Sequence, residues 1–245
     1  MTALDFLSPD LAGAGLAARS PLAPEALAAG ARVEVRDGWE VVAGYGEREL
    51  ELRALGESVA FVDSSQLGAI ELQGPQSPLG ELPMLPRLGE PAIRADGAWW
   101  CRVTPTRALV VCEAPATAKV RRALDSATAW STLDVTAAYA GLTLAGPLAR
   151  EALARFCALD LRPGVVPVGG FRPGSVARTP GALLREADAR YLLLFGAAYG
   201  GYVWSVVADA VTRLGGRPAG LDALAEAAPL HAGPGVAPGE EPGDA

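Results

Sequence analysis

One phrase occurs twice in this chain, and it constrains the fold more than any other feature of the sequence. The first copy, FVDSSQLGAIELQGP, spans Phe61–Pro75, and the second, LDVTAAYAGLTLAGP, spans Leu133–Pro147. Each copy has an aspartate near its start, then a hydroxyl-bearing residue, an alternating apolar run and a closing Gly-Pro. Strand–turn phrases also recur by chance, but internal similarity indicates a duplicated structural unit. We therefore expect two related halves, with strands that end at Gly74-Pro75 and Gly146-Pro147.

The second copy opens a run of elements that favours an α+β fold, because its apolar residues follow strand and helix periods in turn. The predicted elements are, in order, a strand within 133–147, a helix opened by Pro147, strands at 174–186 and 189–195 joined by EADA, and a helix over 199–214 stopped by Gly215-Gly216. This order is that of a split β-α-β unit, in which helices cover one face of an antiparallel sheet.

The first half reads as a less regular copy of the same unit. Its predicted elements are a strand, turn and strand over 31–46, a short helix or strand over 47–55, a strand pair from VAFVDSS and GAIELQGP, a loop over 76–98, a buried strand over 107–114 and a helix that starts at Pro115. We divide the chain into an N-terminal extension (1–30), a first α+β half (31–130), a second α+β half (131–227) and a disordered acidic tail (228–245).

Composition excludes several classes of partner. The net charge of −7 and the pI of about 4.9 repel phosphate backbones, so we expect no nucleic-acid partner. No apolar run approaches the ~20 residues of a membrane span, and the N-terminus lacks a signal-peptide pattern, so we expect no membrane partner. Cys101, Cys112 and Cys157 have no metal-ligand spacing and suit a reducing compartment as buried apolar side chains. The expected location is cytoplasmic.

The residue types that catalysis needs are scarce. His231 is the only histidine and lies in the predicted tail, which excludes a Ser-His-Asp or Cys-His arrangement and any histidine-based metal site. No GxGxxG or GxxxxGK[ST] motif opens a helix, and the glycine-rich stretch at 167–175 reads as a turn. We predict no catalytic residue and no metal site.

Five residues are candidates for binding a ligand. Asp63 and Asp134 occupy equivalent places in the two phrases, where each carboxylate either caps a turn or faces a pocket. Asp96, Tyr139 and Arg178 complete the set.

Three stretches resemble the folate-binding aminomethyltransferase superfamily, the family of the glycine-cleavage T-protein. The opening RSPLAPEALAAGARVEVRDGWEVVAGYG contains the family's SPL, GA and GWE…YG in order. VAFVDSSQLGAIELQGP is similar to the family phrase GVFDVSHLGKIEVRGP, and GGRPAGLDAL is similar to the start of its GLGARD motif. The resemblance spans residues 19–227 and implies a fold of two related α+β halves.

The middle and end are most similar to one branch, the gamma subunit of heterotetrameric sarcosine oxidase. The matching stretches are LDVTAAYAGLTLAGPLAREALARFCALDLRPG, VARTPGALLRE and YLLLFGAAYGGYVWSVVADA. The family's catalytic members carry an Asn-Asp pair, and this chain contains no asparagine. Their pterin-holding glutamate falls on Leu192 and their GLGARD arginine falls on Leu224, and the family's C-terminal barrel is missing.

The resemblance therefore implies the fold, while the departures argue against the activity. We expect a non-catalytic subunit of a folate-linked amine-oxidising complex, with flavin on flavoprotein partner subunits and no cofactor bound by this chain alone, although tetrahydrofolate stays possible. Two alternatives remain open. One is a stand-alone aminomethyltransferase-like enzyme acting on tetrahydrofolate, with Asp96 as its acid, and the other is a folate-binding adaptor protein.

Overall fold

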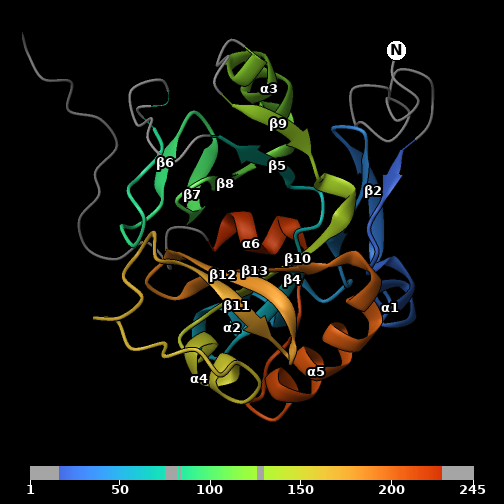
Figure 1. The fold of residues 1–245 in the computed structure, drawn as a ribbon. Helices are drawn as coiled ribbons and strands as arrows, with labels where there is room; N and C mark the ends of the chain where they lie inside the picture. The colour runs from blue at the N-terminus through green and yellow to red at the C-terminus, as the bar shows by residue number, and fades with distance from the viewer. Residues whose placement is uncertain (1–16, 75–81, 83, 126–129, 228–245) are drawn as a thin grey trace, which may run out of the picture.

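Two β-sheets stacked face to face form the body of the protein in a computed structural model. The structure describes residues 17–74, 82, 84–125 and 130–227. Helix α3 (Thr117–Asp125) covers the outer face of one sheet, and α4 (Ala149–Ala154) and α5 (Gly200–Thr212) cover the outer face of the other (Figure 1). Most of the predicted N-terminal extension and the predicted acidic tail lie outside the described residues.

The two large sheets have the same internal order. The six-stranded sheet consists, in spatial order, of β11 (Phe171–Val176), β12 (Thr179–Ala187), β13 (Arg190–Gly196), β10 (Tyr139–Ala145), β4 (Ala60–Asp63) and β14 (Arg217–Pro218). The five-stranded sheet consists, in spatial order, of β6 (Ile93–Ala95), β7 (Ala98–Thr104), β8 (Arg107–Cys112), β5 (Gly68–Gln73) and β9 (Ser131–Asp134). In each sheet three consecutive strands are followed by one strand from each copy of the repeated phrase.

The predicted duplication is thereby confirmed as two α+β halves, and the described residues form no closed barrel. Gly74 follows the last residue of β5, and Gly146 follows the last residue of β10; Pro75 lies outside the described residues. One prediction about the first half is wrong, because β4 and β5 do not pair with each other. The chain crosses from one sheet to the other between these strands, so each half supplies a strand to the sheet of the other.

A second correction concerns the stretch 174–186, which was expected to form one strand. It forms the end of β11 and most of β12, joined by a tight turn at Ala177 and Arg178. Both turn residues have left-handed backbone angles, with φ of 48° and 62°. Such angles are usually adopted by Gly, Asn or Asp, and those residues are the ones that mark a turn in a sequence. Ala177 and Arg178 are not of these types, so the turn could not be recognised from the sequence.

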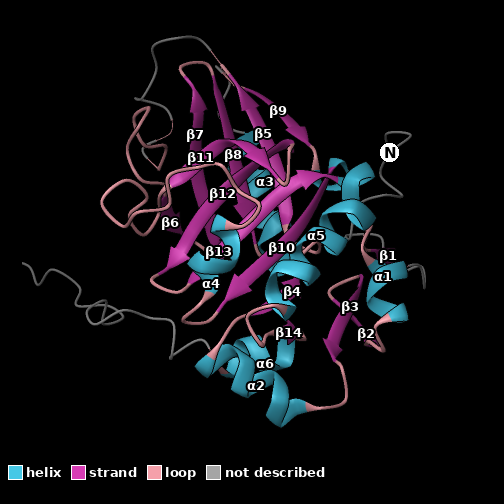
Figure 2. Ribbon diagram, turned by 90° about the horizontal axis from the view of Figure 1, so that it is seen from below, coloured by secondary structure: helices cyan, strands magenta, loops and turns pink. Residues whose placement is uncertain are grey.

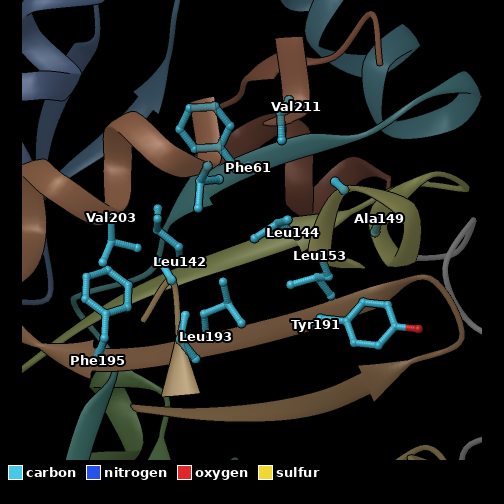
Figure 3. Close-up of a cluster of buried hydrophobic side chains, with 14 of the residues drawn as sticks. Phe61, Leu142, Leu144, Ala149, Leu153, Tyr191, Leu193, Phe195, Val203 and Val211 are labelled. Atoms are coloured by element: carbon cyan, nitrogen blue, oxygen red, sulfur yellow. The ribbon is translucent and has the colours of Figure 1, made fainter. Parts of the chain in front are cut away.

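The largest core cluster joins the six-stranded sheet to α4 and α5 (Figure 3). Phe61 and the ring of Trp204 meet edge to face at 4.9 Å between centroids. The predicted helix over 199–214 is confirmed as α5, and Gly215 follows its end with φ of 75°. Tyr199 and Tyr202, expected on the apolar face, are instead 45% and 50% exposed. Helical periodicity thus identified the face, but at this end of the helix the described residues leave it about half exposed.

The N-terminal described residues add a small sheet beside the sandwich. It contains β1 (Ala18–Arg19), β3 (Trp39–Gly44) and β2 (Arg32–Arg36) in spatial order, with α1 (Ala23–Ala28) following β1. The predicted strand, turn and strand over 31–46 are thus confirmed. The ambiguous stretch 47–55 forms a helix within α2 (Arg48–Glu57), which packs with α6 (Leu221–Glu226) against β4 (Figure 2).

Candidate functional site

The two copies of the repeated phrase make matching crossovers between the sheets. After β4, Asp63 Oδ1 accepts the backbone N–H of Ser65 at 3.0 Å. After β9, Asp134 Oδ1 accepts the backbone N–H of Thr136 at 3.0 Å. Both carboxylates therefore cap a turn, as one of the two interpretations of the sequence predicted. The hydroxyl of Ser65 then accepts the N–H of Gly141 at 3.2 Å, and that of Thr136 accepts the N–H of Ala69 at 2.9 Å.

The strand register repeats the same symmetry. Asp63 lies opposite Leu142 on β10, and Asp134 lies opposite Ile70 on β5. Each crossover strand thus pairs with the apolar run of the other phrase. The pairing makes the two halves reciprocal, and beside each crossover lies a cavity lined by residues of both sheets.

The first of these cavities, which we call the polar opening, lies beside the β4–β5 crossover. Its volume is 230 Å³, and its walls include Ser64, Trp99, Glu113, Thr143, Arg190 and Leu224. Sites for drug-sized ligands span about 300–1,000 Å³, so this cavity is small. The indole of Trp99 is 92% buried in one wall, and Arg94 lies 5.4 Å above its ring.

The charged groups of the polar opening are paired with one another. Arg94 bonds to Glu113 at 2.6 Å, and Arg190 bonds to Glu186 at 2.9 Å. Each pair is neutral overall, and their groups already have a partner before any ligand arrives.

One of the two positions that the family resemblance assigns to folate recognition falls at this opening. Leu224 forms part of its wall, whereas Leu192 does not line it and lies fully buried between the sheets. A pteridine ring carries several hydrogen-bond donors and acceptors, and two leucine side chains satisfy none of them. Ser64 and Thr143, also in the wall, hydrogen bond to each other at 2.7 Å. Leu192 and Leu224 themselves therefore offer such a ring no hydrogen-bond partner.

The polar opening also lacks an activated nucleophile. Cys112 lines it, but the thiol is buried, with Gly68 O at 3.6 Å and the hydroxyl of Thr117 at 3.5 Å. Burial raises the pKa of the Cys112 thiol, which disfavours the reactive thiolate. Within the described residues no group of three or more His, Cys, Asp and Glu side chains could hold a metal ion.

The five candidate ligand-binding residues do not converge on one cavity. Asp63 lines a 330 Å³ cavity under α1, together with Arg19 and Glu40, which pair at 2.6 Å. Burial raises the pKa of the Asp63 carboxyl. Tyr139 lines a different cavity, the counterpart of the polar opening, which is described below.

The remaining three candidates are exposed. Asp96 lies in the turn between β6 and β7 and pairs with Lys119 at 3.0 Å, and Arg178 lies in the β11–β12 turn. Asp134 approaches Arg121 at 3.7 Å. Their roles as ligand-binding residues stay predictions.

The second opening, which we call the apolar opening, lies beside the β9–β10 crossover and has a volume of 520 Å³. Its walls include Glu71, Val103, Arg107, Tyr139, Ala182 and Tyr199. Sequence reasoning found only Tyr139 among these, because the others come from strands far apart in the chain. The duplicated phrase was the available signal, since it predicts that a site in one half has an equivalent in the other.

The architecture of two reciprocal halves defines an aminomethyltransferase-like fold. It is similar to aminomethyltransferase T of the glycine cleavage system from Bartonella henselae, with a TM-score of 0.69 and 15% identity over 84% of this chain and 60% of that chain. It is also similar to a chain of heterotetrameric sarcosine oxidase from Corynebacterium sp. U-96, solved in complex with pyrrole 2-carboxylate. That match has a TM-score of 0.57 and 20% identity over 69% of this chain and 93% of that chain.

These likenesses concern the fold. The chain spans 60% of the length of the aminomethyltransferase and nearly the whole of the sarcosine oxidase chain. No protein-family model and no curated protein sequence matches it. Within the described ranges, none of the helices is both long and apolar enough to cross a membrane.

Proposed function

We propose that this chain is a non-catalytic subunit of a folate-linked amine-oxidising complex, similar to the gamma subunit of heterotetrameric sarcosine oxidase. One observation carries the proposal: Leu192 and Leu224, the two positions that the family resemblance assigns to folate recognition, are both buried apolar side chains. The charged groups of the polar opening, which Leu224 lines, form internal pairs. The fold is kept while the groups that would recognise a pteridine are apolar.

The extent of the structural match supports the same reading. The similarity covers 93% of the sarcosine oxidase chain, whereas 40% of the aminomethyltransferase chain has no counterpart in it. In the proposed complex the oxidation takes place on flavin held by partner subunits. This chain contributes a surface beside them and binds no cofactor alone.

Helices α1 and α5 offer a surface for such contact. Leu27 on α1 is 50% exposed, and Tyr199 and Tyr202, at and just inside the start of α5, are 45% and 50% exposed. Tyrosine is enriched at protein interfaces because it combines a large apolar ring with a polar tip.

Affinity purification of the full chain from its native host tests the subunit role. We expect stoichiometric co-purification of flavoprotein subunits, seen as flavin absorbance that elutes with the chain. If the chain elutes alone and transfers an aminomethyl group to tetrahydrofolate unaided, the subunit role is wrong and the stand-alone enzyme is correct.

Calorimetric titration of the purified chain with tetrahydrofolate tests the proposal that the chain alone binds no folate cofactor. We expect a dissociation constant weaker than about 1 μM, which corresponds to about −8 kcal/mol, because Leu192 and Leu224 leave polar ring atoms unpaired. Tighter binding without turnover would instead support a folate-binding adaptor.

A further inference from the structure

The strand register relates the walls of the two openings residue by residue. Ile70 and Leu142 are equivalent, because each lies opposite the aspartate of the other phrase. On their other sides Ile70 pairs with Val110, and Leu142 pairs with Leu193. Val110 and Leu193 are therefore equivalent positions in the two halves.

One strand further out, the same register identifies the decisive difference. Val110 lies opposite Trp100, and Leu193 lies opposite Leu183. The preceding residues, Trp99 and Ala182, are thus equivalent, and each lines its own opening. The polar opening thus has the indole of Trp99 in its wall at the position where the apolar opening has only the methyl group of Ala182.

The cavity volumes agree with this exchange. The apolar opening has 520 Å³ and the polar opening 230 Å³. The larger value falls within the ~300–1,000 Å³ that is typical of small-molecule sites. Phe171, Tyr139 and Tyr199 contribute aromatic rings to its wall, which suits contact with a flat ring.

The apolar opening carries one charged pair where its counterpart carries two. Arg107 donates through Nη2 to Glu71 Oε2 at 2.7 Å and through Nε to Glu71 Oε1 at 3.2 Å. Thr104 lies opposite Arg107 in one sheet, and Ala187 lies opposite Arg190 in the other, so these two pairs are equivalent. The residues just before them, Val103 and Glu186, are therefore equivalent too, and the apolar opening has a valine where the polar opening has a glutamate. The apolar opening therefore has no net charge and a single polar edge.

We propose that the apolar opening binds a small, planar, uncharged aromatic or heteroaromatic molecule whose polar edge faces Glu71 and Arg107. A net ionic ligand would leave a charge without compensation beside an apolar wall, which is costly. An amide-like edge matches the pair, because Arg107 does not use Nη1 in its bonds to Glu71, and Glu71 Oε2 accepts from Arg107 while Oε1 also accepts from Gln73 at 2.6 Å. Nη1 can therefore donate to a ligand carbonyl, and the second lone pair of Oε2 can accept a ligand N–H. The inference does not depend on the proposed subunit role.

Benzamide is a suitable probe, with benzoate and benzylammonium as anionic and cationic analogues of similar shape. Isothermal titration of the full chain should give benzamide a dissociation constant below about 1 mM, and at least fivefold weaker binding for both charged analogues. Ala182→Trp, which copies the polar opening, should weaken benzamide binding at least tenfold.

A matched pair of double variants covers the case in which Ala182→Trp does not fold. Glu71→Gln/Arg107→Gln alters the polar edge of the apolar opening, and Glu186→Gln/Arg190→Gln makes the equivalent change in the polar opening. We expect at least fivefold weaker benzamide binding in the first and unchanged binding in the second. Absence of benzamide binding at 5 mM ligand, tighter binding of a charged analogue, or equal loss in both double variants would overturn the proposal.

Discussion

Strands β4 and β9 hold equivalent places in the two sheets, yet their environments are opposite. All four residues of β4 are buried, and all four residues of β9 are exposed. Beside β4 lies β14, and α2 and α6 pack on that side, whereas β9 is the edge strand of its sheet. The duplication thus explains why the two halves share one topology. The elements outside the duplicated unit, here β14, α2 and α6, determine that β4 is buried while the equivalent β9 is exposed.

The largest expected effect sharpens this comparison of β4 with β9. Phe61 and Thr132 each lie two residues before the aspartate of their phrase, and Phe61 is 1% exposed. Phe61→Ala should lower the free energy of unfolding by about 3–5 kcal/mol, because it leaves a cavity beside Trp204. Thr132→Ala, on the exposed strand, should change it by less than about 0.5 kcal/mol. Urea denaturation of both variants measures the difference, and equal losses would mean that β9 is covered in solution.

A smaller effect is expected at the crossovers themselves, where Gly141 and Ala69 are equivalent. A Cβ at Gly141 would lie 2.8 Å from the carbonyl oxygen of Ser64, which is backbone and cannot move aside cheaply. Gly141→Ala should therefore cost about 1–3 kcal/mol of stability. The reverse exchange, Ala69→Gly, should cost only about 0.5–1 kcal/mol from chain entropy. Thermal unfolding of the two variants ranks them, and a larger loss in Ala69→Gly would contradict the close approach.

Sequence reasoning predicted the elements better than their neighbours in space. The two phrases, the helix that became α5 and the strand that became β8 were recognised because each has a regular apolar period. The pairing of VAFVDSS with GAIELQGP was wrong, since strands adjacent in sequence usually pair but here the chain crosses between sheets. Periodicity carries no information about such a crossover.

The openings were harder still to predict. The importance of Ala182 emerges only when its register matches it to Trp99 across the pseudo-symmetry, because an alanine in a strand attracts no attention alone. Glu71 and Arg107 are 36 positions apart and meet only in the folded sheet. Leu192 and Leu224 were singled out by the family resemblance, and the structure places both in buried surroundings.

The smallest expected effect is a change in the pH dependence of stability, and it distinguishes Asp63 from Asp134, the two aspartates that cap the crossovers. Asp63 is 5% exposed, and burial raises the pKa of its carboxyl above the value in the unfolded chain. The folded state then holds this proton to higher pH, so the contribution of Asp63 to stability falls as the pH rises from the ordinary Asp pKa, about 3.9, through the raised one. Asp63→Asn keeps the oxygen that accepts the N–H of Ser65 and should remove this decline.

Chemical denaturation of wild type and variants between about pH 4 and 8 gives the required profiles. At pH 7, Asp63→Asn should be at least as stable as the wild type. Asp134→Asn should lose at most about 0.5 kcal/mol, because its carboxylate is exposed and lies 3.7 Å from Arg121. A loss of stability in Asp63→Asn that is the same at every pH would show that the crossover needs an ionised carboxylate there, and the two caps would then be chemically as well as geometrically equivalent.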